Sequence, residues 1–370
     1  GAQGPAPTEQ AAKKPVSVGL VIDIGGRGDH SFNDAALRGL ELYAAGKKFE
    51  GGRYVDASPD EVRKTLPPHL ASVASSIQPL AVKPIILQSK AMEDYAPNLQ
   101  LLVDQGVELA IGNGYLLANA VRQAAQENPK SRFLLIDSQV LDAQGKVLKL
   151  PNVRTVLFKE QEGSFLVGAL AGLVTKSGKV GFVGGIQVPL IQRFEVGYRA
   201  GVKTTNPQAA QTLAAVYTGS FNNMAAGKQV AQDLIAKGAD VLFHAAGADG
   251  MGVIQAVKEA RAAGKTVYAI GVDSDQFHVA PEVVLTSMMK HTDLAIYQAT
   301  KDLVEGKFDA GEQVLGLKEN GVGMAEVRLD FPGKAEALQK VETLRKRVIA
   351  GEIQVPAVPA DLASFQAAAP

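Results

Sequence analysis

The sequence predicts an α/β fold in which parallel sheets carry helices on both faces. From Val16 onward, short β-branched apolar runs alternate with amphipathic stretches of helical spacing, which is typical of strand–helix repeats. The runs are nearly continuous in apolar residues rather than alternating, which indicates strands buried on both faces. The 370 residues are enough for two domains or one large α/β unit.

The first predicted strand is VSVGLVIDI, residues 16–24, and a polar, glycine-rich break separates it from the helical stretch AALRGLELYAAGKKF. Further apolar runs follow in order: VELAIGNG, RFLLIDSQ, GKVGFVGGI, AAVYTGS, DVLFHAAG, TVYAIGVDSD and VVLTSMM. Helical segments follow most of them: LLANAVRQAAQEN, RFEVGYRAGVKT, AAGKQVAQDLIAKG, GMGVIQAVKEARAAG and DLAIYQATKDLVEG. Ligands of open α/β sheets bind outside the carboxyl ends of the strands, so the polar residues after these runs are candidate site residues.

Three stretches fit this pattern less well. Residues 50–95 are rich in proline and serine and predict an elaborated loop–helix insertion. The end of the chain, KAEALQKVETLRKRVIAGEIQVPAVP, predicts an amphipathic helix, a short strand and a tail over residues 356–370. Residues 1–15 predict a disordered leader, as expected of an exported protein after removal of its signal or of a remnant of expression.

Composition and motifs exclude several classes of function. Basic and acidic residues balance at 38 each, so we predict no nucleic-acid partner. Cysteine is absent, which excludes disulfides, thiol catalysis and cysteine-ligated zinc in this chain. The five histidines have no paired metal-ligand spacing, and no nucleophile elbow, phosphate loop or dinucleotide-binding turn of correct spacing occurs. We therefore predict no metal, no cofactor and no catalysis.

The first candidate site residues lie around the end of the first strand. Asp23 is inside the strand, where a carboxylate needs a partner; a structural or capping carboxylate is the alternative. Ser31, Phe32 and Asn33 open the first helix. A serine or asparagine can cap it, and its free N–H groups can hold a polar ligand. Hydrophobic packing at the start of the helix is the alternative for Phe32.

Other candidates follow later strands. Asp137 ends RFLLID, and Asp273 and Asp275 follow VYAIGV. Ionised carboxylates at strand ends match the hydroxyl pair of a ribose, although any one of them can be a cap. HAAGADGMG, residues 244–252, is a strand-to-helix turn whose Gly247 permits close backbone approach of a ligand; tight helix–sheet packing is the alternative.

Taken together, the segments resemble one family. VGLVIDIGGRGDHSFNDAALRGL resembles the opening of the basic membrane protein family, the nucleoside-binding lipoproteins of ABC importers. NVRTVLFKEQEGSFLVGALAGL, GKVGFVGGIQVPLIQRFEVGYRAG, DVLFHAAGADGMGVIQA, IGVDSDQ, VVLTSMMKHTDLAIY and IAGEIQVP resemble its later motifs, in order, over most of residues 16–355.

The resemblance implies a type I periplasmic-binding-protein fold, with two Rossmann-like lobes joined by three crossovers and the ligand in the cleft. The first lobe is expected over residues 16–150 and 289–312, and the second over 151–288 and 313–355. In purine-nucleoside binders of this family, two aromatic rings enclose the base, while carboxylates and a lysine hold the ribose. Phe32 matches the first aromatic, Phe243 is expected as the second, and Phe194 is the reserve. The other ligand-binding residues implied are Asp23, Ser31, Asn33, Asp137, Gly247, Asp273 and Lys290.

The implied function is a monomeric receptor for a purine nucleoside, at the cell surface or in the periplasm, with an ABC permease as partner. The family anchors itself through a lipidated cysteine at the mature N-terminus, and the sequence as given contains none. Two alternatives stay open: the sequence starts just after a lipid-anchored cysteine, or the protein is exported without a lipid. Ala248-Asp249 and His30 depart from the family pattern, and Asp249 is expected near the cleft. A different solute, such as riboflavin, a pyrimidine nucleoside or a modified sugar, is the alternative; an α/β enzyme or a ligand sensor is a further one.

Overall fold

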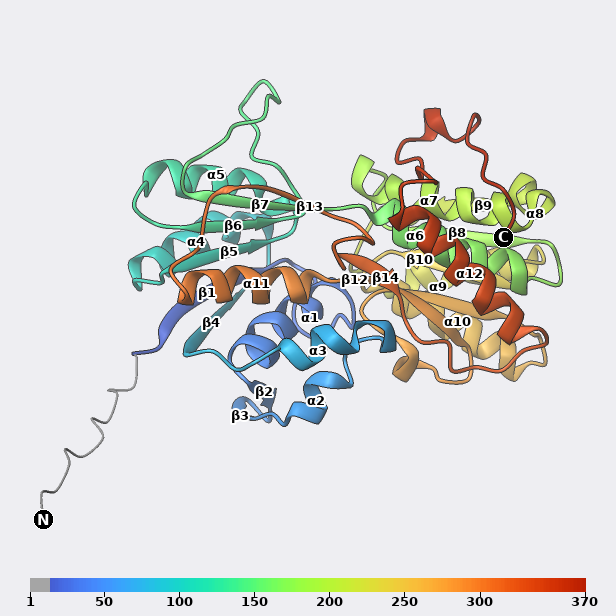
Figure 1. Cartoon of the computed structure of the whole chain (residues 1–370), viewed down its shortest axis with the longest axis horizontal. Coiled ribbons are helices and arrows are strands. Elements are labelled where there is room, and N and C mark those ends of the chain that lie inside the picture. Colours follow the sequence, from blue (N-terminus) through green and yellow to red (C-terminus); the bar gives the residue numbers. More distant parts are fainter. Residues whose placement is uncertain (1–13) are drawn as a thin grey trace, which may run out of the picture.

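The computed structural model describes residues 14–370, which fold into two α/β lobes lying side by side (Figure 1). Each lobe is built around a six-stranded sheet. The predicted class, two Rossmann-like lobes with mainly parallel sheets, is confirmed. The predicted leader lies outside the described residues, except for Lys14 and Pro15.

The first sheet has the strand order β13-β7-β6-β5-β1-β4, and all neighbouring strands in it are parallel. Its strands are β1 (Val16–Ile22), β4 (Val82–Gln88), β5 (Leu109–Asn113), β6 (Phe133–Ile136), β7 (Val153–Phe158) and β13 (Gly311–Leu315). Its main helices are α1 (Phe32–Leu37), which continues as a π-helix over Arg38–Ala44, α4 (Tyr95–Asp104), α5 (Ala118–Glu127) and α11 (Thr292–Val304). Leu20 and Val21 of β1 belong to different hydrophobic clusters. The strand is therefore buried on both faces, as its continuous apolar run predicts.

The second sheet has the order β14-β12-β11-β10-β8-β9, and only β14 is antiparallel to its neighbour. Its strands are β8 (Val180–Gly184), β9 (Ala214–Tyr217), β10 (Val241–Ala245), β11 (Tyr268–Asp273), β12 (Val284–Lys290) and β14 (Val322–Met324). Its helices are α6 (Glu160–Val174), α7 (Pro189–Thr205), α8 (Pro207–Thr212), α9 (Met224–Ala236), α10 (Asp249–Ala262) and α12 (Lys334–Ile349).

Three segments connect the lobes: β7 to α6, β12 to α11, and β13 to β14. The predicted boundaries at residues 150, 288 and 312 are each a few residues too early, because β7 and β13 belong to the first sheet and all of β12 to the second. β7 and β12 are buried strands that lead directly to their connections, so no composition change marks these in the sequence. β13 is a mostly exposed edge strand, so no apolar run marks it.

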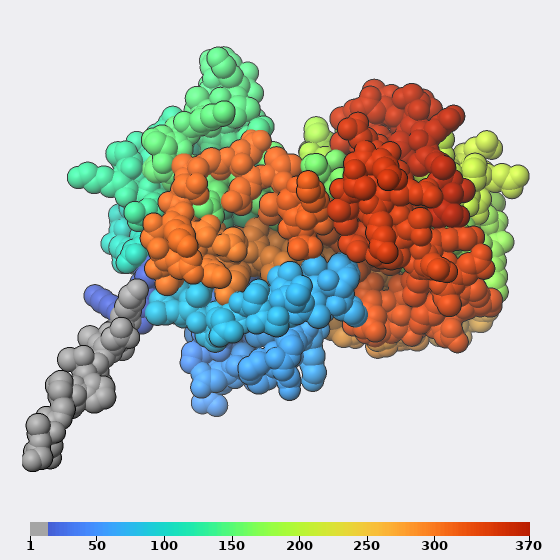
Figure 2. Space-filling view, in the orientation of Figure 1, coloured from blue at the N-terminus to red at the C-terminus, as the bar shows by residue number. Residues whose placement is uncertain are grey.

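The predicted insertion forms a hairpin and two short helices along the lower edge of the first lobe (blue in Figures 1 and 2). These elements are β2 (Lys47–Glu50), β3 (Arg53–Asp56), α2 (Pro59–Arg63) and α3 (Ala71–Ser76). The prediction extended too far, because residues 82–88 form β4 beside β1 in the central sheet. Pro84 interrupts that apolar run, and a proline is tolerated there because β4 is an edge strand.

The end of the chain packs onto the second lobe. Residues 351–358 form no strand, contrary to the prediction, and the tail contains a single turn of 3₁₀-helix over Pro359–Asp361. Phe365 is 9% exposed and meets Phe165 of α6 edge-on, with ring centroids 6.1 Å apart. Lys203 Nζ donates to the Phe365 carbonyl at 2.7 Å. Over residues 14–370, no helix has the length and apolarity needed to cross a membrane.

Candidate functional site

A cavity of about 680 Å³, a volume that includes its open mouth, is lined by residues of both lobes. Each lining segment lies at or just after the carboxyl end of a strand, where open α/β sheets bind ligands. The size lies within the range of small-molecule sites, roughly 300–1,000 Å³. The lining residues are Asp23, Gly25, Asp29, Phe32, Asn33, Gly114, Tyr115, Leu116, Asp137, Leu190, Ile191, Phe194, Phe221, Ala245, Gly247, Ala248, Val272, Asp273 and Lys290.

The structure brings most of the predicted ligand-binding residues together at this cavity. Those that line it are Asp23, Phe32, Asn33, Asp137, Gly247, Asp273 and Lys290. Ser31 does not line it: its side chain is buried behind the wall, and its hydroxyl donates to Asp273 Oδ2 at 2.5 Å. Ser31 therefore orients a carboxylate rather than facing the cavity.

Phe243, expected as the second aromatic, lies inside the second lobe and does not line the cavity. Its ring centroid is 5.2 Å from that of Tyr198 and 5.6 Å from that of Phe182. The reserve residue, Phe194, does line the cavity, and so does Phe221, which sequence reasoning missed. The feature of the sequence that could have identified Phe221 is its position in the polar loop after the strand AAVY.

Lys290 is the central charge of the site and is 2% exposed. Its Nζ lies 2.7 Å from the Asp137 carboxylate and 3.6 Å from Glu160 Oε2. The same nitrogen lies over the rings of Phe32 at 5.2 Å and Phe194 at 5.7 Å, within cation–π range. The direct partner of Lys290 is thus Asp137, a residue of the other lobe.

Burial and the other charges around Lys290 shift its neighbours' pKa values. Burial raises the pKa of Asp137 to about 6; Lys290 opposes this rise and Glu160 adds to it. Burial likewise raises the pKa of Asp273. Burial alone would lower the pKa of Lys290, but the Asp137, Glu160 and Asp273 carboxylates outweigh it and raise that pKa. The ammonium form is therefore the stable one inside the site.

Two of these carboxylates sit on strained backbone. Asp137 has a φ of 74° and Asp273 a φ of 67°, in the left-handed region that residues other than glycine rarely adopt. Both residues end or directly follow a strand of a central sheet, β6 and β11. Backbone strain of this kind concentrates at functional sites, and here it directs two acidic side chains toward one cavity.

On the first-lobe wall, Asp23 and Asn33 form a polar pair. Asn33 Nδ2 donates to Asp23 Oδ1 at 2.5 Å, and the Gly25 amide donates to the same oxygen at 2.9 Å. Asn113 Nδ2 donates to Asn33 Oδ1 at 3.3 Å. Burial raises the pKa of Asp23 against these hydrogen bonds. The Asp23 carboxylate was predicted to need a hydrogen-bonding partner, and that partner is Asn33.

The sequence predicts that the first N–H groups of α1 are free to hold a polar ligand. The structure differs from this prediction. Asp29 accepts hydrogen bonds from the backbone amides of Ser31, Asn33 and Asp34 at 2.8–3.0 Å. Neither Ser31 nor Asn33 caps the helix with its side chain. Because Asp29 accepts from these three backbone amides, they are not available to a ligand. Asp29 therefore acts as the cap of α1, and its position two residues before Ser31 was the signal for this cap in the sequence.

Three other residues singled out from the sequence lie outside the cavity. Asp249, expected near the cleft, is fully buried and bonded to the Thr218 hydroxyl. Asp275 pairs with Arg328 at 2.9 Å. His30 Nδ1 lies 3.3 Å from His278 Nε2 at an exposed position.

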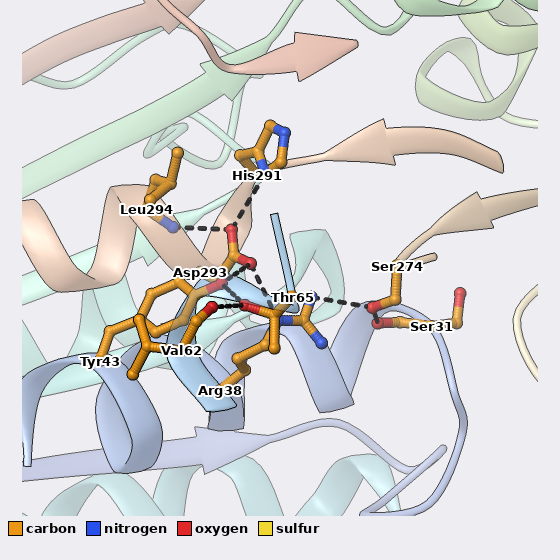
Figure 3. A network of polar contacts seen from close by, with 9 residues as sticks. All are labelled: Ser31, Arg38, Tyr43, Val62, Thr65, Ser274, His291, Asp293 and Leu294. Atoms are coloured by element: carbon orange, nitrogen blue, oxygen red, sulfur yellow. Dashed lines mark hydrogen bonds and ion pairs between the residues drawn. The ribbon is translucent and has the colours of Figure 1, made fainter. Parts of the chain in front are cut away.

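Hydrogen bonds also join the lobes beside the cavity (Figure 3). Ser274 of the second lobe donates to the Ser31 carbonyl at 2.9 Å, and Arg38 donates to the Ser274 hydroxyl at 3.0 Å. Arg38 is held in turn by Asp293 of α11, at 3.0 Å. These contacts hold the first helix against the loop after β11, so the wall containing Phe32 is fixed relative to Asp273. Within residues 14–370, no group of three or more His, Asp or Glu side chains is arranged to hold a metal ion.

Comparison with known proteins places the chain in a family. Residues 16–358 match the family described as Bmp, ABC transporter substrate-binding protein PnrA-like. A CD4+ T-cell-stimulating antigen of Listeria monocytogenes is 32% identical over 94% of this chain and 90% of its own length. The ABC transporter nucleoside-binding protein BmpA of Lactococcus lactis is 30% identical over 94% of this chain and 91% of its own.

Among solved structures, an ABC transporter solute-binding protein from Aeropyrum pernix superimposes with a TM-score of 0.72 at 26% identity. The match covers 95% of this chain and 96% of that protein. The fold, the cavity at the strand ends and the match over nearly the whole chain agree. This protein belongs to the Bmp family of PnrA-like ABC transporter substrate-binding proteins.

Proposed function

We propose that this protein is the receptor of an ABC importer and binds a purine nucleoside between its two lobes. The observation that carries the proposal is the composition of one cavity, where aromatic rings from both lobes lie beside buried carboxylates and one ammonium group. A nucleoside has two matching halves, a flat base and a sugar with several hydroxyls. The nucleoside-binding name of the Lactococcus lactis relative supports the same ligand class.

For the base, we propose that Phe32 and Phe221 stack on its two faces. Phe194 also lines the cavity, but it is only 2% exposed and packs against Phe243, so little of its ring is free. Phe221 is half-buried and comes from the opposite lobe to Phe32. Stacking on an aromatic side chain contributes roughly 1–3 kcal/mol per base.

For the sugar, we propose that Asp137, Asp273 and Lys290 bind the ribose hydroxyls. Lys290 Nζ lies 2.7 Å from both oxygens of the Asp137 carboxylate. Each carboxylate oxygen has two lone pairs, so Asp137 keeps acceptor capacity for a hydroxyl. Ionised carboxylates accept strong hydrogen bonds from such donors. Asp23 and Asn33 lie on the same wall as Phe32, and we propose that they bind the polar edge of the base. We propose that the backbone at Gly247, which also lines the cavity, contacts the ligand as well.

Substrate-binding proteins of ABC importers act outside the cytoplasmic membrane and deliver a small solute to a permease, and we propose this setting here. A monomeric state, a lipid anchor and the absence of catalysis remain predictions. Turnover of a nucleoside during incubation with the protein would contradict the last of these.

The test is a thermal-shift screen against adenosine, guanosine, inosine, cytidine, uridine, riboflavin, free purine bases and common sugars. A ligand at 100 times its Kd adds about 2.7 kcal/mol of stability. The proposal expects purine nucleosides to raise the Tm by several degrees and free bases or sugars to leave it unchanged. A rise with riboflavin or a sugar alone would replace the purine nucleoside by that solute.

A further inference from the structure

The aromatic wall of the second lobe depends on a short loop. Residues 218–223 connect β9 to α9 and contain Phe221, which lines the cavity. The loop lies at the carboxyl end of β9, an edge strand of the sheet. Only one neighbouring strand supports it there, so contacts from other segments have to determine where the Phe221 ring lies.

Asp249 supplies the side-chain contacts that hold both ends of this loop. Its Oδ2 accepts from the Thr218 hydroxyl at 2.6 Å, and its Oδ1 accepts from the Asn223 amide at 2.5 Å. The side chain is fully buried, although it lies at the start of α10 and not on the cavity wall. One carboxylate therefore connects the residue three positions before Phe221 to the residue two positions after it.

The backbone of Asp249 is itself held in place. A Cβ on Gly227 of α9 would lie 2.0 Å from the Asp249 carbonyl oxygen, so α9 packs directly on it. The amide of the adjacent Ala248 donates to the Phe221 carbonyl at 3.0 Å. The anchor of the loop is thus a tightly packed helix start rather than a mobile side chain.

The Phe221 ring packs directly on Gly185, and the backbone of Phe221 lies close to Gly247. A Cβ on Gly185 would lie 2.3 Å from Phe221 Cε1, and one on Gly247 would lie 3.2 Å from the Phe221 carbonyl oxygen. Such close packing holds only for one position of the loop, since a shift of the loop backbone moves the ring off Gly185.

We propose that Asp249 is a positioning residue that sets the Phe221 ring at the stacking distance for a purine base, and so contributes to ligand affinity without touching the ligand. The inference rests on the proposed function, since it assigns to Phe221 the role of a stacking wall. It also gives a use to a fully buried carboxylate that does not line the cavity.

The test compares Asp249→Ala with a matched control, Asp240→Ala. Asp240 also holds a loop of the second lobe, accepting from the Thr175 hydroxyl at 2.5 Å and from the amides of Lys176 and Ser177, but it does not line the cavity. Calorimetry with adenosine, guanosine and inosine is expected to show about tenfold weaker binding for Asp249→Ala, within the range of a stacking contact. Asp240→Ala should bind like the parent protein.

A double-mutant cycle separates positioning from general damage. In a Phe221→Ala background, Asp249→Ala should change affinity less than about twofold, because the ring that it positions is gone. Asp249→Asn keeps one acceptor oxygen for the Asn223 amide, and its NH2 group can donate to the Thr218 hydroxyl oxygen, so this variant should recover most of the affinity. Equal losses with and without Phe221, or equal losses in Asp249→Ala and Asp240→Ala, would overturn the proposal.

Hydrogen exchange of the ligand-free protein tests the positioning role without any nucleoside. The amides of residues 219–223 should exchange faster in Asp249→Ala than in either the parent protein or Asp240→Ala. Unchanged exchange would overturn the inference. If the parent binds no nucleoside but exchange does change, the proposed function fails while the role of Asp249 in holding the loop stands.

Discussion

Replacing Asp137 by alanine tests whether a buried ion pair holds the polar end of the cavity. The change leaves the Lys290 ammonium, which is 2% exposed, with Glu160 at 3.6 Å as its nearest carboxylate. Removing one partner of a buried pair costs about 3–5 kcal/mol, because the other charge is left uncompensated. Since Glu160 and the nearby aromatic rings still face the ammonium, we expect the lower end of that range, about 3 kcal/mol.

The assay is urea unfolding of the ligand-free protein, followed by circular dichroism at pH 7.5. The double variant Asp137→Ala/Lys290→Met should be more stable than the single variant, because no charge is then left stranded. Glu259→Ala is the control, since it breaks an exposed pair with Lys228 at 3.0 Å and should leave the urea midpoint unchanged. The reasoning fails if Asp137→Ala unfolds at the same urea concentration as the control, or if the double variant is no more stable than the single one.

Three further predictions follow from the structure. Phe221→Ala should weaken purine-nucleoside binding by roughly 5- to 150-fold, the equivalent of 1–3 kcal/mol of stacking; calorimetry that gives the parent affinity would remove Phe221 from the site. Burial lowers the pKa of His244 to about 4, so the stability from the neutral imidazole is present above pH 6.5 and is lost as the pH falls through 4. Between pH 7 and pH 4 the parent should therefore lose about 3 kcal/mol more unfolding free energy than His244→Gln, and parallel pH curves in urea unfolding would refute this. Phe365→Ala should lower the unfolding free energy by about 3 kcal/mol, because the ring is 9% exposed and packs on Phe165; a change below 1 kcal/mol in urea unfolding would mean that the tail adds nothing to the second lobe.

Periodicity was enough to predict an α/β fold with parallel sheets, because parallel strands buried on both faces give continuous apolar runs. The two-lobed arrangement was implied by the family resemblance. Periodicity alone did not predict it. It failed at local interruptions. β4 was assigned to an insertion because Pro84 breaks its run, although an edge strand accepts a proline. The crossovers after β7 and β12 were placed too early, because these strands continue to the crossover without a turn signal. The crossover after β13 was also placed too early, because β13 is mostly exposed and has no continuous apolar run.

The site was predicted better at strand ends than within strands or loops. Asp137 and Asp273 were found because a charged residue directly after an apolar run is conspicuous. Phe243 lies two residues before the end of β10, inside the sheet, so its ring packs into the core and stays away from the cavity. Phe221 lies in a polar loop that Asp249 contacts at both ends through hydrogen bonds, and no local pattern predicts these contacts.

The most direct test of the central claim is calorimetric titration of the protein with inosine, and separately with hypoxanthine and with ribose. If one cavity binds base and sugar together, inosine should bind at least about 100-fold more tightly than either half, because each half forgoes stacking or the carboxylate contacts. Binding of free ribose or free hypoxanthine as tight as that of inosine would contradict the claim.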